Sequence, residues 1–406
     1  MLERHIKNEL QEYLNIMPVV LLSGARQTGK TTLAKSLRPS YQYVTFDDDM
    51  ILSNAKRDPA GWLSQMPKPI ILDEIQRVPE IFLAIKKDVD ENREAGRYLL
   101  TGSANPLLLP NLSDSLAGRM GIVNLYPFSQ GELLGKKEKF IDKIFSSKIE
   151  FQEYDNFSFE ELYEIYFKGG FPPVQLLNTE KDVSRWILSY LQTIMSKDIR
   201  DITNIEKLSE LPNLFKLLAT RSSMLINFAD LSRSLGMVNM TLRRYLRLLE
   251  ILFFVYLLPP WFSNMGKRIT KSPKLHLCDI AMLKYLLDVD KNRLIKNPTY
   301  TGPFLENFVF TEFLKQKSWN DFNFDIFHFR DGNHEVDFVL EKQDGTIIGI
   351  EVKSAKTLQK KDFSGLLYLK KIAKEKFKRG IILHLGNQIQ PVFENIWAMP
   401  IQSLWS

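Results

Sequence analysis

Short apolar runs separated by polar turns and helical stretches dominate the first 135 residues. Several of these runs end in polar or acidic residues, a pattern typical of buried parallel strands that alternate with helices. We expect an amphipathic helix over Met1–Met17 and then strands at Val19–Leu22, Tyr43–Phe46, Pro69–Leu72, Arg97–Leu100 and Met120–Leu125. This alternation predicts an α/β domain with a parallel sheet over residues 1–135.

A helical pattern replaces the strands in the middle of the chain. Residues 136–207 begin with dense charges and continue with a helix at Trp186–Arg200, which predicts a helical lid or linker. Residues 208–278 start a second helical unit. The elements expected within it are helices at Phe228–Gly236 and Leu242–Leu249, the second capped by Asn239 or Thr241, and strands at Ile251–Leu258 and Lys274–Leu277. Two helices, a tight turn and two strands predict a winged helix-turn-helix.

The pattern changes again in the C-terminal part, residues 279–406. An amphipathic helix at Leu305–Leu314 opens it. Strands are then expected at Phe324–Phe329, Glu335–Leu340, Thr346–Val352 and Gly380–Leu385, with a helix at Leu358–Phe377 before the last strand. The order helix, three strands, helix, strand predicts a second α/β domain.

The composition is that of a globular protein with several domains. The chain has 406 residues, 44% of them hydrophobic, and its longest purely apolar run, Ile251–Leu258, is far too short to cross a membrane. Cys278 is the only cysteine, so neither an internal disulfide nor a thiolate metal cluster can form, and its apolar neighbours predict a core position. The N-terminus shows no signal-peptide pattern. We therefore expect a cytoplasmic protein without a membrane partner.

The net charge of +6 is distributed unevenly. The segment from Glu351 to Arg379 contains ten Lys and Arg against three Asp and Glu. Such a local excess indicates an anionic partner, with nucleic acid as the first candidate. A solvated, lysine-rich helix face is the alternative.

The strongest chemical signal follows the first expected strand. A Gly-Ala-Arg-Gln-Thr-Gly-Lys-Thr-Thr segment fits the phosphate-binding loop G-x-x-x-x-G-K-[ST] in its strand–loop–helix context. Backbone N–H groups of such a loop hold phosphate oxygens, its lysine adds a cation, and the next hydroxyl ligates Mg²⁺. The expected nucleotide-binding residues are Gly24, Ala25, Arg26, Gln27, Thr28, Gly29, Lys30, Thr31 and Thr32.

Two adjacent carboxylates, Asp73 and Glu74, end the strand at Pro69–Leu72. We expect Asp73 to hold Mg²⁺ together with Thr31, and Glu74 to polarise the water that attacks the γ-phosphate. ATP and Mg²⁺ are thus the expected cofactors, with Lys30 and Glu74 as catalytic residues. The acidic run Asp47–Asp49 also lies near this edge, and we interpret it as a turn and helix cap rather than a metal site.

Two other polar residues belong to the same part of the chain. Ser103 follows the strand at Arg97–Leu100, where it either contacts the nucleotide or, with Asn105, caps the next helix. Arg119 lies between a short helix expected at Ser113–Gly118 and the last strand. It is either a catalytic arginine finger toward the nucleotide of a second subunit in a homo-oligomer, or one half of a local salt bridge.

Together these motifs resemble those of a large prokaryotic family of AAA-type ATPases joined to a C-terminal domain of unknown function. The residues that carry the resemblance are the loop Gly24–Thr32, Asp73 and Glu74, Thr101–Ser103, Ser115–Arg119 and Tyr126–Ser129, with a Gly-Gly-x-Pro segment in the middle of the chain. The resemblance covers nearly the whole chain. It implies an ATP-binding AAA module and a winged-helix fold for the middle.

The expected winged helix carries basic residues where nucleic acid is commonly read. Arg243, Arg244 and Arg247 lie on its second helix, and Lys267 and Arg268 in the loop between its strands. We expect these residues to face phosphates or bases of double-stranded DNA. A winged helix that packs against protein is the alternative.

The C-terminal strands bring three charged residues together. Asp337 lies on one strand and Glu351 and Lys353 on its neighbour, the latter two on one face because they are two residues apart. This D…E-x-K arrangement resembles the core of the restriction-endonuclease-like family. In that family, residues in the positions of Asp337 and Glu351 would ligate Mg²⁺ or Mn²⁺ while Lys353 stabilises the charged phosphate or hydroxide, and Glu306 can add a carboxylate. Many domains of this kind are catalytically silent.

Three functions remain open from these observations. The first is an ATPase whose nucleotide state controls a DNA-contacting C-terminal half. The second is an ATP-gated, metal-dependent nuclease. The third is an ATP-dependent switch that recruits a protein partner without further catalysis.

Overall fold

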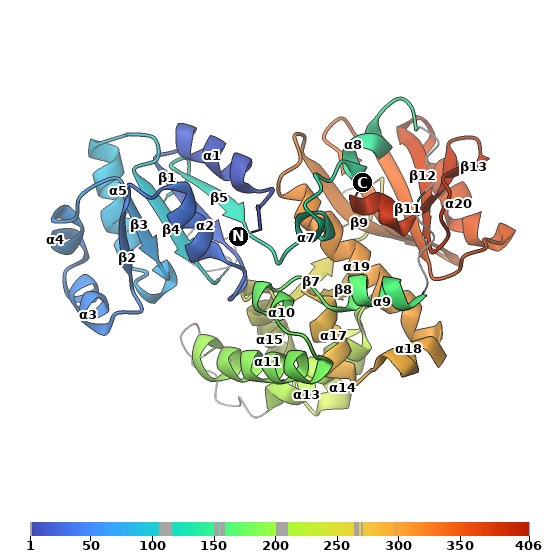
Figure 1. The fold of residues 1–406 in the computed structure, drawn as a ribbon, viewed down its shortest axis with the longest axis horizontal. Helices are drawn as coiled ribbons and strands as arrows, with labels where there is room; N and C mark the ends of the chain where they lie inside the picture. The colour runs from blue at the N-terminus through green and yellow to red at the C-terminus, as the bar shows by residue number, and fades with distance from the viewer. Residues whose placement is uncertain are drawn as a thin grey trace.

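The described part of the chain contains three β-sheets, each with its own set of helices (Figure 1). The computed structural model describes residues 2–104, 116–149, 154, 159–199, 210–263, 268, 271–296 and 298–405. The N-terminal sheet forms one lobe and the C-terminal sheet another, and the helices of the middle region lie below and between them in Figure 1.

The N-terminal sheet has the order β2-β3-β4-β1-β5, and all its pairings are parallel. Val19 and Leu21 of β1 enter one hydrophobic cluster, while Val20 and Leu22 enter another. Burial on both faces explains why these strands are continuous apolar runs. The strands are β1 (Val19–Ser23), β2 (Gln42–Thr45), β3 (Ile70–Asp73), β4 (Tyr98–Gly102) and β5 (Met120–Asn124). The helices are α1 (Lys7–Ile16), α2 (Lys30–Leu37), α3 (Asp49–Arg57), α4 (Pro59–Ser64), η1 (Ile75–Arg77) and α5 (Ile81–Glu91).

The middle region is helical with a small antiparallel sheet of order β6-β8-β7. Helix α14 (Phe228–Leu235) ends at Gly236, which has a φ of +62°, and α15 (Asn239–Ile251) follows. The expected helix–turn–helix order is therefore present. The other elements are α9 (Phe159–Phe167), α10 (Pro172–Gln175), α11 (Glu180–Thr193), η3 (Ile194–Asp198), α13 (Leu211–Thr220), β6 (Met224–Leu225), β7 (Val255–Leu258), β8 (Lys274–Leu277), α17 (Ile280–Leu287) and α18 (Lys291–Lys296).

The C-terminal sheet has six strands in the order β13-β14-β12-β11-β10-β9. Strand β11 pairs antiparallel with β10 and parallel with β12. The expected order of helix, three strands, helix and strand is present, and a further hairpin follows it. The elements are α19 (Pro298–Lys317), β9 (Phe324–Asp331), β10 (His334–Lys342), β11 (Ile347–Lys353), η5 (Lys360–Phe363), α20 (Ser364–Ala373), η6 (Lys374–Lys376), β12 (Phe377–His384), β13 (Gln390–Phe393), β14 (Ile396–Pro400) and η7 (Ile401–Trp405).

One hydrophobic cluster runs from the middle region into the C-terminal sheet, so residue 278 does not divide two independent cores. The short helix α8 (Phe140–Phe145) belongs to this cluster. Phe140 stacks on Phe313 of α19 with ring centroids 6.1 Å apart, and Arg379 donates a hydrogen bond of 2.6 Å to the carbonyl oxygen of Ile144. The first part of the expected 136–207 lid therefore packs on the C-terminal domain, because its aromatic residues complete that core.

Several local expectations are confirmed and others are corrected. The Asp48 carboxylate caps α3 by accepting from the N–H groups of Met50 and Ile51, and Cys278 is buried. The expected caps Asn239 and Thr241 already lie within α15, which begins without a side-chain cap. Helix α15 runs to Ile251, so β7 is shorter than expected, and the region expected as one helix over 358–377 is a short α-helix between two 3₁₀ turns.

Candidate functional site

The phosphate-binding loop connects β1 to the N-terminus of α2 and requires glycine at two positions. A Cβ atom at Gly24 would lie 2.1 Å from the carbonyl oxygen of Leu125. Gly29 has a φ of +95°, a conformation that residues with a side chain rarely adopt. The close approach of Leu125 explains Gly24, and the left-handed backbone conformation explains Gly29. Both glycines allow the loop to fold over a phosphate.

Lys30 lies inside the curl of this loop. It is buried, and its Nζ donates hydrogen bonds to the carbonyl oxygens of Gly24 at 2.9 Å and Ala25 at 2.8 Å. Thr28 closes the same turn by donating to Ala25, and the hydroxyl of Tyr190 on α11 donates to the carbonyl oxygen of Arg26. The lysine is therefore held beside the loop backbone that would bind phosphates. Of the remaining loop residues, Gln27 has a φ of +64° and Thr32 is exposed.

Asp73 at the end of β3 accepts hydrogen bonds from three hydroxyl groups. Thr31 Oγ1 lies 3.1 and 3.0 Å from its two carboxylate oxygens, the Tyr43 hydroxyl lies 2.7 Å from Oδ2, and the Thr101 hydroxyl donates to Oδ1. Burial and the contact with Asp73 raise the pKa of Tyr43. The two expected Mg²⁺ ligands, Thr31 and Asp73, are thus in direct contact. The contacts of Tyr43 and Thr101 with Asp73 were not predicted, although Thr101 lies near the end of the strand beside β3.

Glu74 follows Asp73 in a left-handed backbone conformation, with φ +58° and ψ +45°. The side-chain amide of Gln76 donates to the Glu74 carboxylate and, at 2.8 Å, to the hydroxyl of Ser103. That hydroxyl also lies 3.3 Å from the Glu74 carboxylate. Ser103 therefore contacts Glu74, whereas Asn105, the other residue proposed as a cap, lies outside the described residues. No sequence motif pointed to Gln76, which lies two positions after Glu74 on the 3₁₀ turn η1.

Arg119 forms the local salt bridge that was one of its two expected roles. Its Nε lies 2.5 Å from Oδ1 of Asp90 on α5, and its side chain remains 31% exposed. The hydrogen bond from Arg119 lowers the pKa of Asp90. Residues 116–119 form a turn, and the first residues of the helix expected at Ser113–Gly118 lie outside the described part of the chain.

Arg4 ties the phosphate-binding loop to the segment that leaves the N-terminal domain. Its guanidinium donates to the carbonyl oxygens of Thr28 at 2.9 Å and Tyr126 at 2.5 Å, and to the carboxylate of Glu132 at 3.0 Å. The guanidinium also lies over the ring of Phe128, 4.5 Å from its centroid. Burial lowers the pKa of Arg4 although Glu132 opposes the effect. A movement of the loop would therefore be transmitted to this segment through the hydrogen bonds of Arg4.

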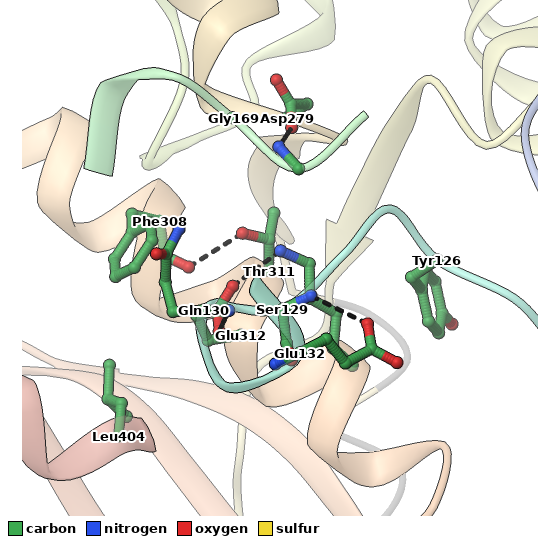
Figure 2. Close-up of polar contacts among 12 residues, drawn as sticks. Tyr126, Ser129, Gln130, Glu132, Gly169, Asp279, Phe308, Thr311, Glu312 and Leu404 are labelled. Atoms are coloured by element: carbon green, nitrogen blue, oxygen red, sulfur yellow. Dashed lines mark hydrogen bonds and ion pairs between the residues drawn. The ribbon is translucent and has the colours of Figure 1, made fainter. Parts of the chain in front are cut away.

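Helix α7 (Gln130–Leu134) connects that segment to the C-terminal domain (Figure 2). Ser129 and Glu132 form a capping box at its start, and the N–H of Gln130 donates to the carboxylate of Glu312 on α19 at 3.0 Å. Glu312 also pairs with Lys315 at 2.6 Å. Burial raises the pKa of Glu312 to about 7, with Lys315 acting in the opposite direction. Figure 2 shows the start of α7 against Thr311 and Glu312.

The C-terminal sheet brings the D…E-x-K residues together. Asp337 and Glu351 each lie one residue beyond the paired residues Phe338 and Ile350 of β10 and β11, and the N–H of Val352 donates to Asp337 Oδ2 at 2.9 Å. Lys353 Nζ lies 3.1 Å from the Glu351 carboxylate. Burial and the nearby Asp337 raise the pKa of Glu351 well above its usual value. The expected constellation is therefore assembled, with both carboxylates buried.

Lys274 of β8 enters this site from the middle region, which the sequence did not predict. Its Nζ lies 2.8 Å from Glu306, 3.0 Å from Glu335 and 3.4 Å from Asp337. Burial raises the pKa of Glu306 to about 8, with Asp337 adding to the effect and Lys274 opposing it. Among the described residues, no group of three or more His, Cys, Asp or Glu side chains is arranged to hold a metal ion.

The basic residues expected to contact DNA have different environments. Arg243, Arg244 and Arg247 are exposed on α15, with Arg243 lying 4.0 Å from the ring centroid of Phe228. Arg268 instead pairs with Glu341 of β10 through both terminal nitrogens, and its side chain is only 13% exposed. Arg268 therefore does not lie on an open wing, because it joins the middle region to the C-terminal sheet. Lys267 lies outside the described residues.

The basic segment from 351 to 379 is partly used for packing. Lys378 and Arg379 donate to carbonyl oxygens at the end of α8, and Lys370 pairs with Glu394. Its exposed lysines are Lys356, Lys360, Lys361, Lys371, Lys374 and Lys376. These six residues remain on the surface around η5, α20 and η6.

Comparison with known families agrees with the N-terminal part of this description. Residues 17–134 match the model of an AAA domain, which agrees with the phosphate-binding loop and the parallel sheet of the N-terminal part. Residues 159–293 and 301–404 match two models described as domains of unknown function. None of the helices in the described ranges is long and apolar enough to span a bilayer.

Individual relatives match most of the length of this chain. An uncharacterized protein of Mycobacterium tuberculosis is 28% identical over 399 residues, covering 97% of this chain and 82% of that protein. An uncharacterized protein of Methanocaldococcus jannaschii is 25% identical over 350 residues, covering 82% of this chain and 74% of that protein. Among solved structures, the Walker-type ATPase of Pyrococcus abyssi is 13% identical with a TM-score of 0.40, covering 70% of this chain and 96% of that one.

Proposed function

We propose that this protein hydrolyses ATP with Mg²⁺ at the edge of its N-terminal sheet. The observation that carries the proposal is the contact between the Thr31 hydroxyl and the Asp73 carboxylate, beside a loop whose lysine is already turned inward. Mg²⁺ would supply charge neutralisation between these two residues when bound. Lys30 would exchange its loop carbonyl partners for phosphate oxygens.

Glu74 is the residue we assign to the water that attacks the phosphate. Its carboxylate would orient that water and accept its proton. Gln76 and Ser103, which bond to Glu74, would hold the carboxylate in position. Glu74→Gln should bind ATP with little change but hydrolyse it at least tenfold more slowly, while Lys30→Ala should lose binding. If the purified wild-type chain neither binds nor hydrolyses ATP with Mg²⁺, the proposal is wrong.

We also propose that Arg119 acts on the nucleotide of a second subunit. Its exposed pairing with Asp90 is a surface ion pair, which costs little to break. Mixing Arg119→Ala with Lys30→Ala tests the idea, since mixed assemblies contain some sites with both residues intact. Recovery of ATPase activity in the mixture supports a finger in trans, and two inactive variants that stay inactive together speak against it.

The C-terminal half is proposed to contact double-stranded DNA. The exposed lysines around α20 and the exposed arginines of α15 support this, because surface cations without a buried role are available to phosphates. Lys360→Glu with Lys361→Glu should weaken DNA binding and flatten its salt dependence. The same charge change at Lys56 and Arg57, on α3 in the other lobe, is the matched control. ATPase rates with and without DNA show whether the two halves are coupled.

Nucleic-acid cleavage is the second candidate, supported by the assembled Asp337, Glu351 and Lys353. A second Mg²⁺ or Mn²⁺ at these carboxylates would have to displace Lys274, so the residues as placed do not fit a bound metal. Salt-insensitive, weak nucleic-acid binding would favour the third candidate, a nucleotide-dependent switch that recruits a protein.

A further inference from the structure

A buried lysine occupies the centre of the acidic site in the C-terminal domain. Lys274 is 1% exposed and reaches Glu306 of α19 and Glu335 and Asp337 of β10 at 2.8, 3.0 and 3.4 Å. The lysine comes from β8, the central strand of the three-stranded sheet in the middle region. The contact therefore joins two parts of the chain more than thirty residues apart.

The carboxylates around this ammonium are already engaged in hydrogen bonds and ion pairs. Asp337 uses Oδ2 for the N–H of Val352 and Oδ1 for Lys274, while Glu351 is paired with Lys353. Mg²⁺ needs several oxygens at about 2.1 Å in octahedral geometry. The ammonium of Lys274 contacts Glu306, Glu335 and Asp337 and therefore occupies the space between these carboxylates that a metal ion would need.

A second buried polar side chain, His276, lies beside the same site. His276, on the same strand as Lys274, is fully buried, and neither ring nitrogen has a hydrogen-bond partner among the described residues. Its Nε2 lies 4.0 Å from Glu306, and its ring stacks on Phe310 at 4.2 Å. A neutral imidazole thus lies beside the Glu306 carboxylate, where it can serve as a further ligand.

We propose that Lys274 is the resident cation of this acidic site, and that its side chain and a divalent metal ion exclude each other there. As long as β8 is docked on the C-terminal domain, the D…E-x-K residues hold the lysine and bind no metal. Metal binding requires the lysine to be withdrawn or removed. The inference concerns the nuclease-like site and does not depend on ATP hydrolysis.

The charges at the site explain why removing the lysine should create a metal site. The carboxylates are those of Glu306, Glu335, Asp337 and Glu351, and the cations are Lys274 and Lys353. Lys274→Met keeps much of the aliphatic stem but deletes the ammonium. The remaining cluster keeps its carboxylate oxygens on facing elements, with His276 beside them, and has lost the cation that occupied the space between them.

The experiment is a Mn²⁺ titration of the nucleotide-free full chain, in which electron paramagnetic resonance measures the free ion. The variants are wild type, Lys274→Met, Asp337→Asn and the double variant; asparagine is chosen because it still accepts from Val352. We expect wild type and Asp337→Asn to bind equally. Lys274→Met should bind one additional Mn²⁺ per chain, at least tenfold more tightly than wild type binds the ion. The double variant, which combines Lys274→Met with Asp337→Asn, should not bind this additional Mn²⁺.

A surface lysine provides the matched control. Lys317 is on α19, the helix that carries Glu306, and pairs with the exposed Asp325 at 2.7 Å. Lys317→Met should gain no Mn²⁺. Circular dichroism shows whether each variant is folded, and ATPase rates report on the N-terminal site separately. If the wild-type protein shows no ATPase activity, the proposed function is wrong, but the comparison of Mn²⁺ binding among the variants remains valid.

Two results would overturn the inference. The first is a Mn²⁺ ion on wild-type protein that disappears in Asp337→Asn, because the site would then be open despite Lys274. The second is a folded Lys274→Met variant that binds no more Mn²⁺ than wild type. If Lys274→Met does not fold, the comparison of wild type with Asp337→Asn still decides, since equal binding supports the inference and unequal binding refutes it.

Discussion

Glu74 has a left-handed backbone conformation, with φ +58° and ψ +45°, which costs a residue with a Cβ about 1–2 kcal/mol relative to glycine. Glu74→Ala removes the carboxylate but retains this backbone cost, whereas Glu74→Gly removes both. Glycine loses about 0.5–1 kcal/mol more conformational entropy on folding. The difference leaves Glu74→Gly more stable than Glu74→Ala by about 0.5–1 kcal/mol.

Thermal unfolding of the full chain measures this difference, which corresponds to a higher melting temperature on the order of 1 °C for the glycine variant, because the unfolding entropy grows with chain length. Asn54 provides the matched control, because it is exposed and has the ordinary backbone conformation of helix α3. There the order should reverse, because alanine is favoured over glycine by about 1 kcal/mol in a helix interior. All Glu74 variants, including Glu74→Gln, should lose most ATP hydrolysis.

The reasoning is refuted if Glu74→Ala melts at the same temperature as Glu74→Gly or higher, with the Asn54 pair behaving normally. In that case the backbone at Glu74 stores no strain. A Glu74→Gln variant that hydrolyses ATP at the wild-type rate would instead show that the carboxylate does not act on the attacking water. Strain and chemistry at one residue are thus tested separately.

Lys30→Ala should weaken ATP binding at least tenfold in calorimetry, because the loop loses the buried ammonium that lies beside its backbone, while Lys56→Ala on α3 should not. His328 has a pKa lowered to about 4 by burial and by Lys274, so the unfolded chain binds its proton first. Stability should therefore fall between pH 6.5 and pH 4, by roughly 3 kcal/mol from this group, and His328→Gln should lessen that fall in pH-dependent melting. Glu312→Gln leaves Lys315 buried without its charge partner and should destabilise the protein by about 3–5 kcal/mol in denaturant unfolding. Asp325→Asn, which breaks a surface ion pair with Lys317, should cost less than about 1 kcal/mol. An equal loss of stability in both variants would contradict the role of Glu312 as the buried partner of Lys315.

The sequence predicted elements whose cause is local. The apolar runs of the N-terminal sheet, the glycine that ends α14 and the Asp48 cap all follow from neighbouring residues, and they are present in the structure. The loop, Asp73 and Glu74 could be predicted because their spacing is fixed by one strand–loop–helix unit and one strand end. Whether each of them has its expected role stays a prediction.

What the sequence did not predict depends on contacts between distant segments. Lys274 reads as an ordinary strand residue, and only the docking of β8 on β10 and α19 places its ammonium among three carboxylates. The docking of α8 on the C-terminal core has the same origin, since Phe140 finds Phe313 on a helix far along the chain. Tyr43 reaches Asp73 only because β2 and β3 are neighbours in the sheet. No periodicity within a single segment contains this information.

Helix α19 is the element that links the two sites. Glu312 on this helix accepts from the N–H of Gln130 at the start of α7, and Glu306, six residues earlier, holds Lys274. Six residues of α-helix span about 9 Å, so the two contacts lie at fixed positions on one rigid body. Arg4 continues the connection from α7 to the carbonyl oxygen of Thr28 in the phosphate-binding loop. Contiguity alone does not transmit a signal, because an element with two states is also required. Under the proposal for Lys274, the docking of β8 has two such states: a shift of α7 that moves α19 must either carry Lys274 along or separate it from Glu306.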